Sequence, residues 1–193
     1  MIKPILLIFD APVTWDKIAR AQRSMGAVLF QQLIPIIVLS VAGEIAGRMY
    51  LRPPHGAAQA AAFPNLMAAY GAAQVIFSFL LVLIGAQLIK AVAETFHARH
   101  TFTQCFTVAA YGLGPFFLVR WLDVIPGMNV WVTFGIGIVL TISTLYYGLP
   151  CVLKPDPPNA FGLFFMSGLL LLMVGGLARL ITWLVLQGRI HVL

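Results

Sequence analysis

Between Pro53 and Ile89 the chain reads PPHGAAQAAAFPNLMAAYGAAQVIFSFLLVLIGAQLI, without a single Asp, Glu, Lys or Arg. Four other long stretches share this property: Ser24–Gly43, Thr101–Val119, Val124–Leu153 and Pro157–Ala178. Because a helix rises about 1.5 Å per residue, about 20 apolar residues cross a hydrocarbon core of about 30 Å. The sequence therefore predicts five transmembrane helices.

The overall composition leads to the same class of protein. Of the 193 residues, 61% are hydrophobic and only 9% are charged, whereas soluble domains carry about 25% charged residues. We therefore predict an all-α, polytopic integral membrane protein with a lead-in over residues 1–23 and a single transmembrane domain over 24–193. The five spans are expected near residues 25–45, 66–89, 102–122, 130–149 and 160–186.

The lead-in has an amphipathic pattern. Trp15, Ile18, Ala19 and Gln22 fall near one helical face, while the basic residues of this segment lie elsewhere. This pattern is typical of a short helix that lies in the membrane interface, with Trp15 at the level of the lipid headgroups. An ordinary turn before the first span is the alternative.

The distribution of Lys and Arg predicts the orientation. A cytoplasmic N-terminus places seven of them inside: Lys3, Lys17, Arg20, Arg23, Lys90, Arg99 and Lys154. Four then lie outside: Arg48, Arg52, Arg120 and Arg189. We expect a cytoplasmic N-terminus and a C-terminus on the opposite side. The net charge is +6, and we interpret the basic residues as topology signals and as contacts with anionic lipids. No nucleic-acid partner is expected, because no recognition motif is present.

Prolines interrupt two of the predicted spans. Pro35 and Pro115 lack the N–H group that would bond the carbonyl four residues back, which belongs to Gln31 or Tyr111. Neighbouring helices, side chains or water must satisfy these carbonyls. The kinks are therefore consistent with simple packing or with a pocket. The candidate residues of such a pocket or pathway are Gln31, Gln32, Tyr111, Pro115, Arg120, Asp123 and Tyr146.

Small residues recur at four-residue spacing. Gly43 and Gly47 form a GxxxG pair, and Ala110 and Gly114 form a looser version of it. Such spacing lets helix backbones approach closely in lipid. The pattern predicts either a tight bundle or an oligomer face, without distinguishing them.

Charges at membrane depth are the best general indicators of function. Glu44 and Arg48 are four residues apart and can pair on one helical face. The same spacing relates Lys90 to Glu94, and Arg120 and Asp123 are three apart. Arg179 lies inside the fifth span, where it either reaches the interface or pairs with Glu44, Asp123 or a lipid phosphate.

Known catalytic and metal-binding patterns are missing from the sequence. It contains no GxSxG, HExxH or Walker A motif, so we expect no enzyme activity and no cofactor. His97, His100, Cys105 and Cys151 fall on the predicted inner side, but without a CxxC pair they do not indicate a metal site. Cytoplasmic cysteines also make a structural disulfide unexpected.

Three short segments resemble a known family. They are PVTWDKI at Pro12–Ile18, CFTVAAYGLGP at Cys105–Pro115 and LYYGLP at Leu145–Pro150. Together with the span count, they are similar to the bacterial inner-membrane branch of the Yip family of Ypt/Rab-interacting membrane proteins. The resemblance implies no established catalytic residue, and only Tyr111, Pro115, Tyr146, Gly148 and Pro150 transfer as motif positions. The long cytosolic region of the wider family is absent ahead of the first span, so Rab binding is not expected to carry over.

These observations favour a non-enzymatic protein of the bacterial inner membrane. It would organise the membrane or interact with other membrane proteins, and would form a homo-oligomer through its small-residue faces. The alternative is a small transporter or channel with a polar pocket at the kinked first and third spans. A close-packed centre would favour the first function, and a water-filled cavity ringed by the candidate polar residues would favour the second.

Overall fold

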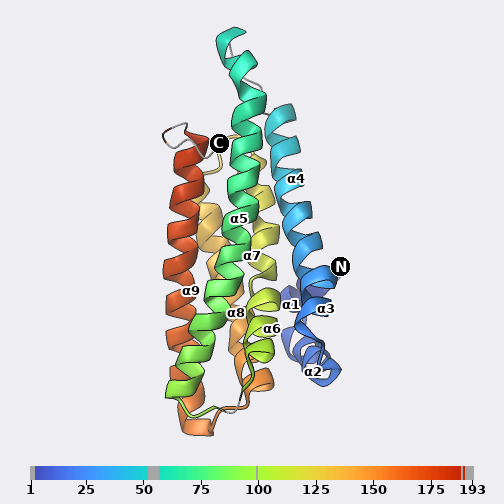
Figure 1. Cartoon of the computed structure of the whole chain (residues 1–193), viewed down its shortest axis with the longest axis vertical. Helices are drawn as coiled ribbons and strands as arrows, with labels where there is room; N and C mark the ends of the chain where they lie inside the picture. Colours follow the sequence, from blue (N-terminus) through green and yellow to red (C-terminus); the bar gives the residue numbers. More distant parts are fainter. Residues whose placement is uncertain (1–2, 52–56, 99, 188, 190–193) are drawn as a thin grey trace.

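The five apolar stretches form long helices that run along a common direction (Figure 1). A computed structural model of the chain describes residues 3–51, 57–98, 100–187 and 189. Five helical spans are long and apolar enough to cross a membrane: Met25–Leu51, Phe63–Thr95, Phe102–Val124, Val130–Leu153 and Pro158–Leu186. The predicted all-α fold with five membrane-spanning helices is confirmed.

The first span consists of three consecutive helical segments. These are α3 (Met25–Val28), the π-helical η1 (Leu29–Leu33) and α4 (Ile34–Leu51). The N–H of Ile34 donates to the carbonyl of Leu29, five residues back. The wider π turn lies directly before Pro35, which has no N–H to donate. The span thus contains a short π-helical turn before the proline but remains continuous.

The second span is longer than the sequence predicted. α5 runs from Ala57 to Thr95 and contains Pro64 near its beginning, and α4 continues to Leu51. Most of the stretch between the predicted spans 25–45 and 66–89 is therefore helical. Alanine is the strongest helix former, and alanines dominate the first turns of α5.

The third span lies at the centre of the bundle. It comprises α6 (Phe102–Gly112), α7 (Gly114–Val119) and the 3₁₀ turn η2 (Arg120–Val124), which contact α5, α8 and α4 respectively. In its most apolar stretch 72% of the residues are buried, against 28% in the last span. Pro115 divides α6 from α7, and the hydroxyl of Thr144 donates to the Gly112 carbonyl at 3.2 Å. A neighbouring helix thus satisfies a carbonyl at the break.

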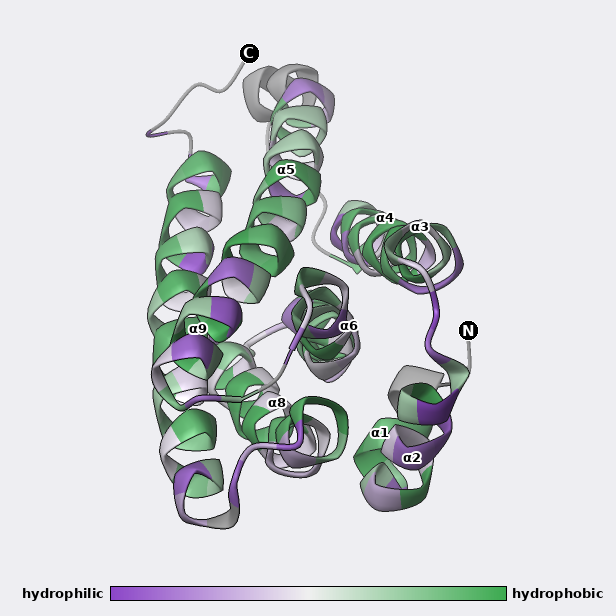
Figure 2. Ribbon diagram, turned by 60° about the horizontal axis from the view of Figure 1, so that its bottom comes forward, coloured by the Kyte–Doolittle hydropathy of each residue, from purple (hydrophilic) through white to green (hydrophobic). Residues whose placement is uncertain are grey.

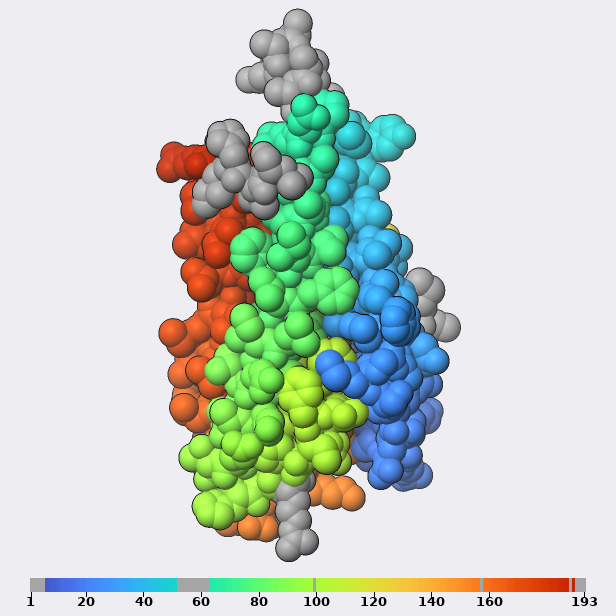
Figure 3. All heavy atoms as spheres, in the orientation of Figure 1, coloured from blue at the N-terminus to red at the C-terminus, as the bar shows by residue number. Residues whose placement is uncertain are grey.

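The last two spans surround this central helix. α8 (Val130–Leu153) continues through Pro150 and ends at Lys154, whose backbone is left-handed. α9 (Pro157–Leu186) follows and packs along α5 and α8. Figure 3 shows α5 on one face of the molecule, between α9 and the first span.

The lead-in forms two helices, α1 (Lys3–Phe9) and α2 (Ala11–Ala21), that lie beside the bundle (Figure 2). An amphipathic helix is present where the sequence predicted one, but its Trp15 packs against the bundle, which the sequence did not predict. Trp15 is 0% exposed, and its indole N–H donates to the Thr144 carbonyl at 2.8 Å. Gly148 makes room for the ring, since a Cβ there would lie 2.5 Å from it. A buried indole needs such a partner for its N–H.

The alternating direction of the spans defines two ends of the bundle. The α2 end contains α2 and the two connections over residues 96–101 and 154–156. The opposite end, here called the far end, contains the end of α4, η2 and the beginning of α8. Each end carries its own group of polar residues.

Candidate functional site

Two polar stripes face each other on neighbouring helices near the far end. Ser40, Glu44 and Arg48 follow one another at four-residue intervals on α4, and Tyr70, Gln74 and Ser78 do so on α5. Residues four apart share a helical face. All six side chains are buried, none more than 6% exposed. Polar groups buried this deeply in a membrane protein need partners within the fold.

Glu44 is the centre of the first half of this site. Its Oε1 accepts hydrogen bonds from Arg48 Nε at 3.0 Å, Arg48 Nη2 at 2.9 Å and the Tyr70 hydroxyl at 2.6 Å. Its Oε2 accepts from Gln74 Nε2 at 2.7 Å. The Arg48 guanidinium also lies 5.4 Å from the centre of the Tyr70 ring, a cation–π distance. The predicted pair of Glu44 and Arg48 is confirmed.

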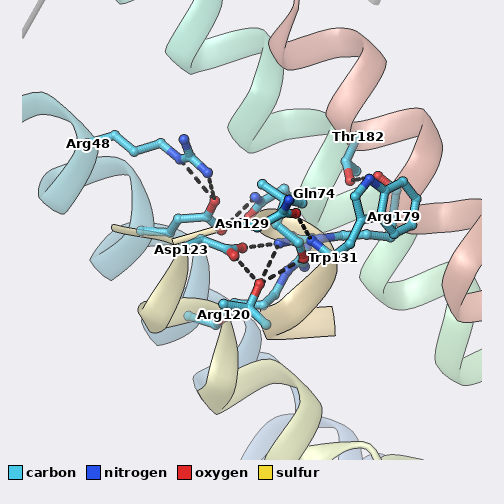
Figure 4. Close-up of polar contacts among 12 residues, drawn as sticks. Arg48, Gln74, Arg120, Asp123, Asn129, Trp131, Arg179 and Thr182 are labelled. Carbon is cyan, nitrogen blue, oxygen red and sulfur yellow. Dashed lines mark hydrogen bonds and ion pairs between the residues drawn. The ribbon is translucent and has the colours of Figure 1, made fainter. Parts of the chain in front are cut away.

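Asp123 is the centre of the second half. It forms an ion pair with Arg179 of α9 and accepts a hydrogen bond from the Thr133 hydroxyl of α8. Thr182 donates to the Arg179 carbonyl at 3.0 Å. Of the partners that the sequence left open for Arg179, the structure selects Asp123. Figure 4 shows Asp123 and Arg179 reaching toward each other from separate helices.

Arg120 of η2 completes the group. It does not pair with Asp123 on its own turn but donates from Nη1 to the Ser78 hydroxyl at 3.2 Å. Its Nε has no hydrogen-bond partner among the described residues. We call this whole set the arginine cluster; it comprises Glu44, Arg48, Tyr70, Gln74, Ser78, Arg120, Asp123, Thr133 and Arg179.

The cluster joins all five spans through buried charged and neutral polar side chains. Removing one member of a buried ion pair leaves the other uncompensated, which is strongly destabilising. The geometry therefore suits a fixed connection between helices. Guanidinium and hydroxyl groups donate hydrogen bonds to both carboxylates, and these bonds hold the helices together.

Only part of the pathway proposed from the sequence lies in this cluster. Arg120 and Asp123 belong to it. Gln31 is exposed on η1 and accepts a hydrogen bond from Arg23, while the neighbouring Gln32 is buried. Tyr146 is 54% exposed.

Tyr111 and Pro115 lie in the close-packed centre of the bundle. Tyr111 is 1% exposed and its ring lies edge-on to Trp15 at 6.4 Å. Phe117, two residues after Pro115, is fully buried and its carbonyl accepts a hydrogen bond from the Ser40 hydroxyl at 2.6 Å. The third span is thus closely packed against its neighbours around Tyr111 and Pro115.

The glycine pair of α4 packs within the chain. A Cβ at Gly43 would lie 2.7 Å from the Trp121 ring, and one at Gly47 would lie 2.3 Å from Val124. The small residues thus let α4 approach η2, which carries Arg120 and Asp123. Ala110 and Gly114 are likewise buried, at the centre of the bundle.

A groove runs along α2 at the other end of the molecule. One part, of about 990 Å³, lies between α2, the beginning of α6 and the end of α8, and its charged residues are Asp16, Arg20, Arg23, Lys154 and Asp156. A second part, of about 700 Å³, is lined by aromatic rings, Tyr146, Tyr147, Phe161 and Phe164. Asp16, Cys151 and Lys154 line both parts, so we describe them together as the α2 groove. Cys105 and Cys151 are free thiols.

The family model of the Yip1 domain matches residues 6–180. The chain belongs to the Yip1 domain family. The match covers the last four residues of α1, all of α2 and every member of the arginine cluster. Yip family proteins are membrane proteins, and the five apolar spans agree with that class. No curated protein and no solved structure matches the chain.

Four residues of the cluster were missed by the sequence reasoning. Tyr70, Gln74, Ser78 and Thr133 are uncharged, whereas charges are the main sequence indicators of function at membrane depth. The four-residue spacing of Tyr70, Gln74 and Ser78 in an apolar helix was the signal that could have identified them. Such a stripe predicts a polar face turned toward a partner helix.

Proposed function

We propose that this Yip1-domain protein is a non-enzymatic protein of the bacterial inner membrane that organises the membrane or interacts with other membrane proteins, binding anionic lipid headgroups in its α2 groove. The observation that carries the proposal is the composition of the groove. Arg20, Arg23 and Lys154 lie beside a pocket of aromatic rings. A phospholipid offers an anionic phosphate to the basic residues and apolar acyl chains to the aromatic pocket.

The packing of the bundle centre supports this function over transport. Phe106, Val108, Ala109, Tyr111 and Phe117 of the central span are no more than 1% exposed. The polar residues that a pathway would use are also dispersed, with Gln31 and Tyr146 on the surface and Arg120 at the far end. A transporter or channel is therefore the less favoured alternative.

The orientation follows the same reasoning. We propose that the α2 end faces the cytoplasm, because the exposed or half-buried Lys17, Arg20, Arg23, Lys90 and Lys154 gather there. Of the other basic residues counted from the sequence, Arg52 and Arg99 lie outside the described residues. The C-terminus would then lie on the opposite side of the membrane. Self-association into a homo-oligomer remains part of the proposal, through faces other than the Gly43–Gly47 contact.

Lipid retention tests the proposal. The detergent-solubilised protein, mixed with equal amounts of phosphatidylglycerol and phosphatidylcholine, should retain phosphatidylglycerol in native mass spectra. Replacing Arg20, Arg23 and Lys154 together by Gln should lower this preference about tenfold or more, since each basic residue near an anionic surface contributes about 1 kcal/mol.

The matched control is Lys90→Gln, which removes one positive charge at the same end but outside the groove-lining residues. It should leave the preference nearly unchanged. Equal retention of the two lipids by the unaltered protein, or an equal loss in the control, would contradict lipid binding in the groove.

A further inference from the structure

The arginine cluster contains more positive than negative side chains. Three arginines, Arg48, Arg120 and Arg179, are each at least 93% buried around two carboxylates, Glu44 and Asp123. The sequence has only six acidic side chains. The other four lie at the opposite end of the bundle: Asp10 directly before α2, Asp16 on α2, Glu94 at the end of α5 and Asp156 directly before α9. No further side-chain carboxylate of this chain is available to balance the third arginine.

Arg120 is the arginine without a carboxylate partner of its own. Glu44 is bonded to Arg48 and Asp123 to Arg179, while among the described residues Arg120 donates only to the neutral hydroxyl of Ser78. The Nε atoms of Arg120 and Arg179 are both buried without a partner among the described residues. A buried and uncompensated guanidinium is costly in a protein and more so at membrane depth.

A small cavity lies beside these two arginines. Its volume is about 10 Å³, and its polar lining consists of Ser78, Arg120, Arg179 and Thr182. The rest of the lining is apolar. About 10–15 Å³ is the least space that accommodates one water-sized particle. The cavity thus has two guanidinium groups and two hydroxyls around room for one small particle, and no carboxylate in its lining.

We propose that this cavity binds one monatomic anion of the halide class, with chloride as the abundant candidate. One negative charge brings the buried cluster from three positive and two negative side chains to neutrality. Guanidinium and hydroxyl groups donate hydrogen bonds to anions, and guanidinium groups carry no acceptor. The cavity holds a particle of about the size of a water molecule, so chloride, which is slightly larger, requires a small outward shift of the arginine side chains. Phosphate, sulfate and a lipid headgroup are far larger. The ion would hold the central span against α5 and α9.

Thermal unfolding of the full chain in a neutral detergent tests this site. Replacing gluconate by chloride at a constant ionic strength of about 300 mM should raise the Tm by about 5 °C, because an anion that binds only the folded state stabilises it. The variant Arg120→Met should lose this rise. Lys90→Gln, which removes an exposed charge at the α2 end, should retain it.

A second measurement does not depend on the stability of that variant. Chloride-35 NMR should show line broadening by the unaltered protein that bromide competes away. The variant Ser78→Ala keeps every charge and should weaken binding at least several-fold. No chloride-specific rise in Tm, which would indicate bound water only, would overturn the proposal. So would a rise that persists in Arg120→Met or disappears in Lys90→Gln.

Discussion

The two ends of this bundle handle charge in opposite ways. At the far end, Glu44, Arg48, Asp123 and Arg179 are buried and paired with one another. At the α2 end, the pair of Lys90 and Glu94 is exposed, with its charged atoms 3.6 Å apart, and basic residues line an open groove. Charges at the far end therefore act between helices, whereas those at the α2 end face the surroundings.

This difference changes how the orientation signal is read. Of the four basic residues that the sequence assigned to the outer side, Arg48 and Arg120 are buried in the arginine cluster. They offer no charge to a lipid surface. Arg189 is exposed. The surface asymmetry between the two ends is therefore larger than a count of residues indicates, and burial should be considered before Lys and Arg are counted.

Asp123→Asn should produce the largest effect, because it breaks a buried ion pair at the far end. The neutral amide keeps the shape but leaves Arg179 without its ion-pair partner, at a cost on the order of 3 kcal/mol. Unfolding of the detergent-solubilised protein by SDS titration measures the loss. A loss below about 1 kcal/mol would mean that the pair contributes no more than a surface contact.

Gly47→Ala should have a smaller effect at the same end. The added Cβ would meet Val124 at 2.3 Å, and overpacking of this kind costs about 1–3 kcal/mol. Gly135→Ala is the matched control, since nothing lies within 4 Å of its Cβ position. It should gain up to about 1 kcal/mol from better helix propensity. Equal unfolding free energies for the two variants would refute the close approach of α4 to η2.

Trp15→Phe should loosen α2 without unfolding the bundle. It keeps an aromatic ring but removes the hydrogen bond to the Thr144 carbonyl, worth about 1 kcal/mol, and so should raise the detached population of α2 roughly fivefold. A spin label at the half-exposed Val13 reports this mobility. Trp131→Phe, at the far end and 44% exposed, should leave the spectrum unchanged; a similar change in both would show that the label reports general loosening.

Glu94→Gln should have the smallest effect. The partners of this i,i+4 pair are 40% and 60% exposed, and such pairs contribute about 0.3–0.5 kcal/mol. The loss should shrink further in high salt, because exposed charges are screened. A double-mutant cycle with Lys90→Gln measures it. A coupling as large as the Asp123–Arg179 effect would remove the distinction between the two ends.

The five spans could be predicted because hydrophobicity along the chain determines them directly. Local spacing also identified Glu44 with Arg48 and the amphipathic α2. The beginning of α5 was harder to predict, since Pro64 indicates a break although the helix continues through it. The proline lies near the N-terminal end of the helix, where losing one backbone hydrogen bond disturbs the remaining span little.

The rest of the site depends on which helix faces come together, and one sequence does not contain that information in local form. Arg179 and Asp123 are 56 positions apart, and nothing in their neighbourhoods favours this partner over Glu44. The place of Trp15 was missed for the same reason. An amphipathic helix fits a lipid surface or a protein surface equally well, and only Gly148 on α8 provides the space that decides between them.

The contact between Trp15 and Thr144 also sets an order of assembly during synthesis. The two residues are 129 positions apart, so the surface that receives the first helices is among the last to be made. At roughly 5–20 residues per second, α1 and α2 wait about ten seconds for α8 to emerge. Throughout that interval an amphipathic helix with a tryptophan on its apolar face is accessible to insertion factors and to the membrane surface. Docking of α2 thus has to follow the synthesis of α8.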